Sequence, residues 1–207
     1  MDTTNLEFMS IGGNCASFAY LPEKRNKGPV DNFQAIKGIL SSAVLFNNAL
    51  IPEIYFSKPI IKDRVPSFEG DSDKEYIFDN YSIVHANPYT EKYKTELERR
   101  MNSFNDFFRN VKSKKNYYFT YSLDWYETSK YKGNVKDEFY KGIEMLKFLN
   151  ILDKVIFVGT KNVEANNNWN FFFSEVPEDI KYVELIDINA YHHGMAYDQF
   201  LDKLKTL

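Results

Sequence analysis

The sequence predicts an α/β protein, a three-layer α/β/α sandwich built on a mainly parallel sheet. Two observations carry this prediction. From residue 7 onward, apolar runs typical of strands alternate with helical patterns, an order typical of a parallel sheet covered by helices. Several of these runs, such as Tyr117–Tyr121, are apolar almost without a break, as strands buried on both faces require.

The expected elements follow from local patterns along the chain. β-rich apolar runs predict five strands, at 7–11, 81–85, 117–121, 154–158 and 182–186. Apolar residues spaced three or four apart predict helices at 33–50, 90–111, 135–149 and 194–207, besides a short one after Cys15. Residues 53–80 are predicted to form an irregular excursion with short strands at 54–56 and 76–78. No repeat or linker interrupts the pattern, so residues 1–207 are expected to form one domain.

Capping residues support two of these helices. Thr90 stands where an N-cap is expected, and Glu91 follows it in the first turn, where a negative charge is favourable. Asp31 or Asn32 is placed to cap the helix at 33–50.

Composition excludes several classes of function. The net charge of −3 does not favour a nucleic-acid partner. The single cysteine excludes an intrachain disulfide and a cysteine-based zinc site. No third glycine follows Gly12-Gly13 and no Gly-Lys-Ser/Thr occurs, so we expect no nucleotide cofactor. His85, His192, His193 and the nearby Asp residues have no recognisable metal-ligand spacing, so we expect no metal. No apolar run is long enough to cross a membrane and no signal peptide opens the chain, so a soluble, cytoplasmic protein is expected. The 18 Phe and 15 Tyr predict a core of large rings, and they also suit a cleft that contacts sugars.

Ligands of open α/β sheets bind beyond the carboxyl ends of the strands, and the predicted strand ends carry reactive and polar residues. In chain order these are Gly12, Gly13, Asn14 and Cys15, then His85 and Asn87, then Ser122 and Asp124, then Gly159 and Thr160. Cys15 would lie in the first turn of a helix, where the helix dipole lowers a thiol pKa. A thiol, an imidazole and a carboxylate at strand ends predict a nucleophile, a base and an orienting acid.

The roles can be assigned residue by residue. Cys15 is the predicted nucleophile and His85 the base, while Asp124 or Asp31 would fix the tautomer of the imidazole. The backbone of the Gly12-Gly13 turn, the N–H of Cys15 and the Asn14 side chain would stabilise an oxyanion, with Asn87 and Ser122 as further polar contacts. Each residue also has a structural interpretation: Cys15 as a small buried side chain, His85 as a strand-end residue, Asp31 as a helix cap and Asp124 as a turn residue. His192 and His193, near Asp187, form a second candidate base or a surface loop.

Four motifs in the same order resemble a bacterial family of papain-like cysteine peptidases, over about residues 6–122. They are Ser10-Ile11-Gly12-Gly13-Asn14-Cys15, Gly28-Pro29-Val30-Asp31, Ile83-Val84-His85, and Glu98-Arg99-Arg100-Met101-Asn102-Ser103-Phe104. The resemblance implies Cys15 as nucleophile, His85 as base and Asp31 as a third member. The chain departs from the family at Asn32, where the family has Trp, and at Ala86, where it has Asp. The strand–helix alternation itself is closer to the Rossmann-like sheet of SGNH hydrolases than to papain.

Together these observations predict a cysteine-dependent hydrolase or acyl transferase that acts on a peptide, acyl or glycan small molecule. Two alternatives stay open. One is a glycan-modifying esterase or transferase of polysaccharide biosynthesis, which an aromatic cleft would suit. The other is a non-catalytic binding protein on the same scaffold, which the departures at Asn32 and Ala86 would suit.

Overall fold

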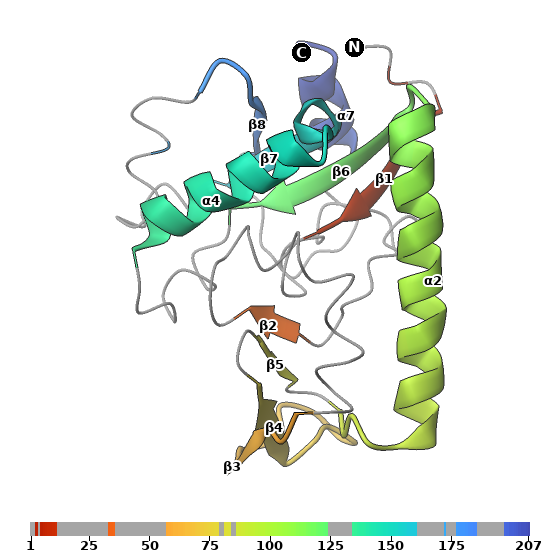
Figure 1. Ribbon diagram of the computed structural model, residues 1–207, viewed down its shortest axis with the longest axis vertical. Helices are drawn as coiled ribbons and strands as arrows, with labels where there is room; N and C mark the ends of the chain where they lie inside the picture. The colour runs from red at the N-terminus through yellow and green to blue at the C-terminus, as the bar shows by residue number, and fades with distance from the viewer. Residues whose placement is uncertain are drawn as a thin grey trace.

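The chain is a mixed α/β protein with two four-stranded sheets, one parallel and one antiparallel (Figure 1). The computed structural model describes residues 3, 5–11, 33–35, 57–78, 81–83, 86–123, 134–160, 172, 177–185 and 197–207. Within these ranges it describes the backbone alone at 33–35, 81–82, 96–97, 100–101, 122 and 160. The α/β class predicted from the sequence is confirmed.

The parallel sheet has the order β1-β6-β7-β8, and every neighbouring pair is parallel. Its strands are β1 (Glu7–Ser10), β6 (Tyr117–Ser122), β7 (Val155–Thr160) and β8 (Lys181–Leu185). All four were expected from their apolar runs. Such runs suit these strands because side chains on both faces of the sheet are buried.

Three helices described by the structure match predicted ones. They are α2 (Glu91–Ser113), α4 (Val135–Phe148) and α7 (Tyr197–Leu204). Thr90 is the N-cap of α2, and its side chain accepts a hydrogen bond from the Tyr93 N–H at 3.3 Å. Asn134 caps α4 in the same way, accepting from the Asp137 N–H. Each cap satisfies one N–H that has no partner inside the helix, so the chain turns into a helix where the local sequence predicts.

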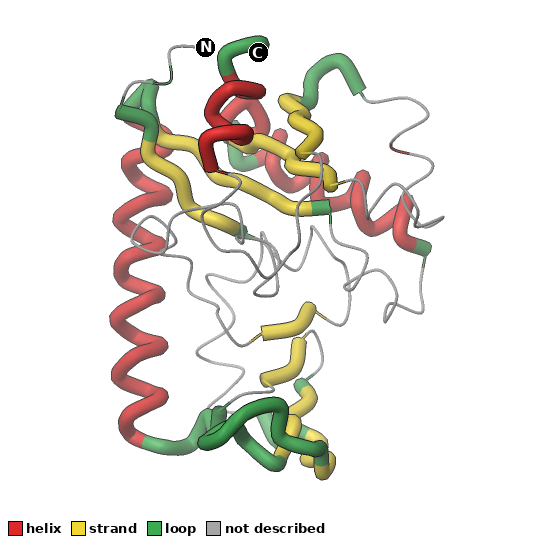
Figure 2. The backbone as a smooth tube through the Cα atoms, turned by 180° about the vertical axis from the view of Figure 1, so that it is seen from behind, coloured by secondary structure: helices red, strands yellow, loops and turns green. Residues whose placement is uncertain are grey.

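Alternate side chains of the parallel sheet enter two separate cores. One core joins Met9, Phe119 and Phe157 to residues of α2 and α4. The other joins Phe8, Ile156 and Val158 to residues of α7. Helices therefore pack on both faces of the sheet, as the tube in Figure 2 also shows.

The antiparallel sheet corrects two sequence-based expectations. It has the order β2-β5-β4-β3, with β2 (Phe33–Ala35), β3 (Ile60–Asp63), β4 (Lys74–Ile77) and β5 (Tyr81–Ile83). The prediction that 81–85 joins the parallel sheet is wrong, because β5 pairs antiparallel with β2 and β4. The prediction of a helix from Phe33 is wrong for Phe33–Ala35, which pair with β5 instead.

A short η3 turn (Leu152–Lys154) leads from the end of α4 into β7. The predicted excursion at 53–80 contains β3 and β4, and β4 covers most of the short strand expected at 76–78. The strand expected at 54–56 lies outside the described residues. None of the helices that the structure describes combines the length and apolar character needed to cross a membrane.

Figure 1 shows α2 running alongside the molecule, from the region of β3 and β4 at its start to the region of β1 at its end. Near its start, the Tyr76 ring of β4 packs edge-on against Tyr89, 5.9 Å between centroids. Nearer its end, the Phe104 ring stacks on that of Phe119 of β6, 5.3 Å between centroids, and the Phe107 ring packs on Phe119 at a tilt, 5.4 Å away. The segment formed by α2 and the turn before it thus contacts the antiparallel sheet through Tyr89 and the parallel sheet through Phe104 and Phe107.

Candidate active site

Two segments predicted to form the site, those beginning at Gly12 and at Asp124, follow the carboxyl ends of the neighbouring strands β1 and β6. Strand pairing continues beyond the bounds of β1 and β6. The Ile11 N–H donates to the Thr120 carbonyl of β6 at 2.9 Å, and the Leu123 N–H donates to the Val158 carbonyl of β7 at 2.8 Å. Ile11 and Leu123 are both buried. Since Gly12 follows Ile11 and Asp124 follows Leu123 in the sequence, the segments that begin at Gly12 and at Asp124 come after neighbouring strands at the same edge of the sheet.

Most of the predicted site residues lie outside the described part of the chain. These are Gly12, Gly13, Asn14, Cys15, Asp31, His85 and Asp124, together with Asp187, His192 and His193. All three histidines and the single cysteine are therefore among them.

His85 follows a strand of the other sheet. Its nearest described neighbours are Ile83, the fully buried last residue of β5, and Ala86. The expectation that His85 stands at a carboxyl end of the parallel sheet is therefore wrong, because β5 is not a strand of that sheet. In Figure 1, however, the arrow of β1 points toward the side of the molecule on which β2 and β5 lie, so the strand before His85 lies on the side toward which β1 ends.

Asn87 is engaged in the turn that precedes α2. Its Oδ1 accepts a hydrogen bond from the Tyr89 N–H at 3.0 Å. Its carbonyl oxygen accepts from the Thr90 N–H at 3.3 Å and from the Thr90 hydroxyl at 3.1 Å. The side-chain oxygen thus mimics a backbone turn, which gives Asn87 a structural role at this position.

Ser122 occupies the last position of β6, in register with Val158 of β7. This places its backbone at the carboxyl edge, one residue before Leu123 and two before Asp124, as the sequence predicts.

Two buried hydroxyl residues beside this edge were not predicted. Ser10 and Thr120 are partners in the pairing of β1 with β6, and both are buried. The structure, so far as it is described, gives the Thr120 Oγ1 no hydrogen-bond partner. An unsatisfied buried hydroxyl costs about 1–3 kcal/mol, so Thr120 is a costly polar position beside the carboxyl edge. The sequence signal is Thr120 itself, a polar residue in an otherwise aromatic run.

Gly159 lets an aromatic ring pack over the carboxyl end of β7. A Cβ added at Gly159 would lie 2.9 Å from Cε2 of Tyr182 and 3.0 Å from its Cζ, closer than such atoms approach. The Tyr182 ring is held in turn by Phe172, edge-on at 5.2 Å. The absence of a side chain at Gly159 therefore sets where the phenol of Tyr182 lies.

We expect Gly159→Ala to lower the free energy of unfolding by about 2 kcal/mol, because the new methyl group displaces a packed ring. In a Tyr182→Leu background the same substitution should cost less than about 1 kcal/mol, since the ring is gone. Urea denaturation of the four proteins of this cycle measures both costs. Equal costs in the two backgrounds would contradict the assigned contact.

At the opposite, amino end of the sheet, two lysines surround Tyr118. The ammonium groups of Lys154 and Lys181 lie 4.9 and 5.9 Å from the centre of its ring. Lys181 donates to the carbonyl of Asp153, and Lys154 donates to that of Lys114 at 3.1 Å. Burial lowers the pKa of Lys181, and burial likewise raises the pKa of Tyr118. These contacts join the starts of neighbouring strands, away from the candidate site.

The described residues contain no group of three or more His, Cys, Asp or Glu side chains arranged to hold a metal ion. The chain matches no family model, no curated protein and no solved structure.

Proposed function

We propose that this protein is a cysteine-dependent hydrolase or acyl transferase whose nucleophile, Cys15, lies at the carboxyl edge of the parallel sheet. The observation that carries the proposal is the pairing of β1 with β6, since it starts the Cys15 and Asp124 segments from adjacent strands. Helices on both faces of the sheet support the finer proposal of a three-layer α/β/α sandwich with a Rossmann-like sheet.

In the proposed reaction His85 removes the proton of the Cys15 thiol, and the thiolate attacks the carbonyl carbon of an amide or ester. The tetrahedral oxyanion is stabilised by the N–H of Cys15 and by Asn14, in the turn that Gly12 and Gly13 permit. The carbon–heteroatom bond then breaks, and the leaving group takes the proton from the imidazolium. Water or an acceptor alcohol or amine attacks the resulting thioester and releases the thiol.

The third member of the site is proposed as Asp124 rather than Asp31. Asp124 comes one residue after Leu123, whose N–H is bonded to β7 at the edge itself. A carboxylate near His85 would hold the imidazole in the tautomer that accepts the thiol proton. Because β5 lies in the other sheet, this mechanism needs the end of β5 to meet the carboxyl edge of the parallel sheet.

Alkylation of the thiol tests the proposal directly, because the chain has a single cysteine and all labelling reports Cys15. The rate of reaction with iodoacetamide across pH gives the thiol pKa, which we expect below the ordinary value of about 8.5. The urea-unfolded protein provides the reference, and Cys15→Ser the blank. His85→Ala should raise the pKa toward the reference, whereas His192→Ala and His193→Ala should leave it unchanged.

Substitution of the two aspartates separates the candidates for the third member. Asp124→Asn should shift the pH profile of alkylation, and Asp31→Asn should not. A thiol pKa equal to that of the unfolded protein would contradict the nucleophile. It would favour the alternatives in which Cys15 takes no part in chemistry: a glycan-modifying enzyme with another nucleophile, or a binding protein.

A further inference from the structure

The strand β3 is an exposed edge of the antiparallel sheet. It is the last strand in the order β2-β5-β4-β3, and among the described strands it pairs with β4 alone. Both faces of β3 are open: Ile60 and Ile61, which point to opposite sides, are 65% and 57% exposed. Exposed isoleucines on both faces of an edge strand are unusual for a surface that stays in water, because edge strands can add a further strand.

One hydrogen bond determines which backbone groups of β3 face outward. The Arg64 N–H donates to the Asp73 carbonyl at 2.9 Å, which continues the pairing of Asp63 with Lys74. Along an antiparallel strand, residues whose backbone N–H and C=O groups bond to the neighbouring strand alternate with residues whose groups point away from it. The backbone groups of Ile60 and Lys62 therefore bond to β4, while those of Ile61 and Asp63 point outward. Pro59, two residues before Ile61, is also a position whose backbone points outward. Proline has no N–H to donate, and an outer edge tolerates this because no strand has to be bonded there. Within the part of the chain that the structure describes, no strand pairs with the outer side of β3 at Ile61 and Asp63.

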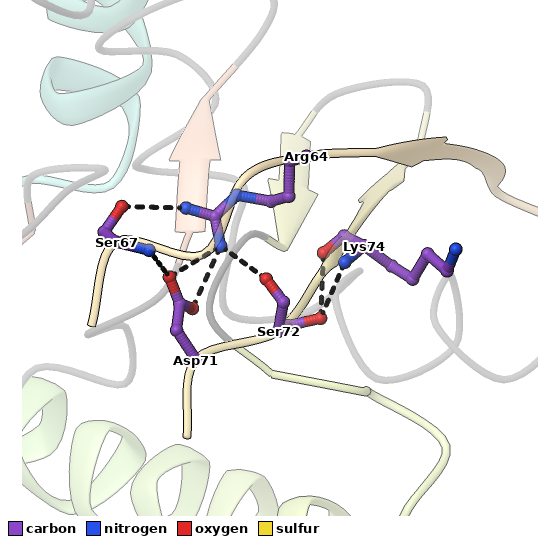
Figure 3. Close-up of polar contacts among 5 residues, drawn as sticks. All are labelled: Arg64, Ser67, Asp71, Ser72 and Lys74. Carbon is purple, nitrogen blue, oxygen red and sulfur yellow. Dashed lines mark hydrogen bonds and ion pairs between the residues drawn. The ribbon is translucent and has the colours of Figure 1, made fainter. Parts of the chain in front are cut away.

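The loop that follows β3 is held in one conformation (Figure 3). Arg64 donates to both carboxylate oxygens of Asp71 at 2.9 Å and to the Ser72 carbonyl at 2.8 Å. The Ser67 N–H donates to the same carboxylate at 2.6 Å. Val65, which is 87% exposed, lies within this clamped loop. A loop held in this way orders little further on binding, which lowers the entropic cost of forming a complex.

The side chains of β3 indicate the chemistry of a complementary strand. In the pairing with β4, Ile60 lies opposite Ile77 and Lys62 lies opposite Glu75. The strand that already pairs with β3 therefore has an apolar residue opposite Ile60 and an acidic residue opposite Lys62. Asp63 is neutralised by an ion pair with Lys74. No ion pair joins Lys62 to any residue that the structure describes, and the same holds for Lys58, two residues before Ile60. Unpaired positive charge thus flanks an exposed apolar residue on one face of the strand.

We propose that the outer edge of β3 binds an extended peptide segment of another protein, in which acidic residues flank an apolar one. The segment adds an antiparallel strand, with backbone hydrogen bonds to Ile61 and Asp63. Its acidic residues lie opposite Lys58 and Lys62, and its apolar residue lies opposite Ile60.

A second copy of this chain complements the same edge less well than an acidic peptide does. Two-fold antiparallel pairing must bond outward residues to outward residues, which leaves few registers. Ile61 paired with Asp63 of the copy sets Lys62 against Lys62. Ile61 paired with itself sets Lys58 against Arg64, which already has Asp71 as its ion partner, and Asp63 paired with itself opposes two carboxylates that are each paired with Lys74. Only the first register opposes two charges that have no ion partner among the described residues, but none of the three places an acidic side chain opposite Lys58 or Lys62.

Binding can be measured by fluorescence anisotropy with a fluorescein-labelled, end-blocked peptide of core sequence Glu-Tyr-Ile-Thr-Glu. We expect it to bind at least about fivefold more tightly than the matched peptide Lys-Tyr-Ile-Thr-Lys, since two cross-strand charge pairs change sign. Lys62→Glu should weaken binding of the acidic peptide by about fivefold and Ile61→Pro by about tenfold. Lys136→Glu, an exposed charge reversal on α4, is the control and should leave affinity unchanged.

Ile61→Pro removes an N–H that makes no bond within the sheet, so the variant should fold, as a melting curve checks. Hydrogen exchange gives a second readout: the peptide should slow exchange at the amides of Ile61 and Asp63, while Lys62 is protected with or without it. Equal affinity for the two peptides, or no binding, would overturn the proposal. Slow exchange at Ile61 and Asp63 that depends on protein concentration without peptide would show instead that a second copy covers the edge.

Discussion

Replacement of Phe157 by alanine is expected to lower the free energy of unfolding by about 4 kcal/mol, the largest effect we predict for a single side chain. Phe157 is fully buried in β7, at the centre of a group of aromatic rings. Its ring contacts Phe139 of α4 at 5.6 Å, Tyr121 of β6 at 5.8 Å and Phe172 at 6.4 Å. Truncation removes all three contacts and leaves a cavity that rigid neighbouring rings cannot close.

Phe148 provides the matched control, because it is also a phenylalanine but is 90% exposed at the end of α4. Phe148→Ala should change the free energy of unfolding by less than about 0.5 kcal/mol. Urea denaturation followed by circular dichroism measures both variants. Similar losses at the two positions would contradict the assignment of Phe157 to the core between β7 and α4.

Removal of Asp71 is expected to destabilise the antiparallel sheet by about 3 kcal/mol, because it removes the buried carboxylate that forms an ion pair with the largely buried Arg64 guanidinium. The Asp71 side chain is fully buried and that of Arg64 is only 17% exposed. Asp71→Ala also frees the N–H of Ser67 and the end of the loop next to β3. The loss should appear as faster hydrogen exchange and proteolysis at residues 64–73, since local opening exposes this segment first.

Two controls show whether burial of the pair is the cause. Asp202→Ala breaks the exposed ion pair between Asp202 of α7 and Lys205, which follows the last residue of the helix, and should cost less than about 0.5 kcal/mol. The double variant Arg64→Met, Asp71→Leu should be more stable than Asp71→Ala, since it removes both charges of the buried pair and fills their place with apolar side chains. If Asp71→Ala and Asp202→Ala have equal effects, the clamp does not hold the loop.

The two sheets bear differently on the proposed function. In the parallel sheet, the segments that contain Cys15 and Asp124 follow two adjacent strands, β1 and β6. Backbone hydrogen bonds from Ile11 and Leu123 hold the last described residues of these segments at the sheet. The antiparallel sheet carries the strand that leads to His85. A catalytic pair of Cys15 and His85 would therefore join the two sheets, and substitutions that loosen β5 should reduce thiol reactivity even when the parallel sheet is intact.

Local sequence was enough to predict the elements of the parallel sheet and its helices. Thr90 caps α2 and Asn134 caps α4 through bonds to residues three positions on, so their effect is visible in a short window of sequence. The unbroken run Tyr117–Tyr121 indicates a strand covered on both faces, whichever strands lie beside it. Such signals depend on neighbours along the chain, and they predicted the α/β class.

Strand partnership, by contrast, was decided only in the tertiary structure. The segment Tyr81–Ile83 reads as a strand in any context, yet its place between β2 and β4 depends on residues up to fifty positions away. The alternation of Tyr81, Ser82 and Ile83 was the available signal, because antiparallel strands alternate where buried parallel strands do not. Phe33–Ala35 became a strand rather than a helix for the same reason: pairing with β5 outweighs the weak helical preference of three residues. Hydrogen bonds between strands form across space, and a local pattern cannot specify which partner supplies them.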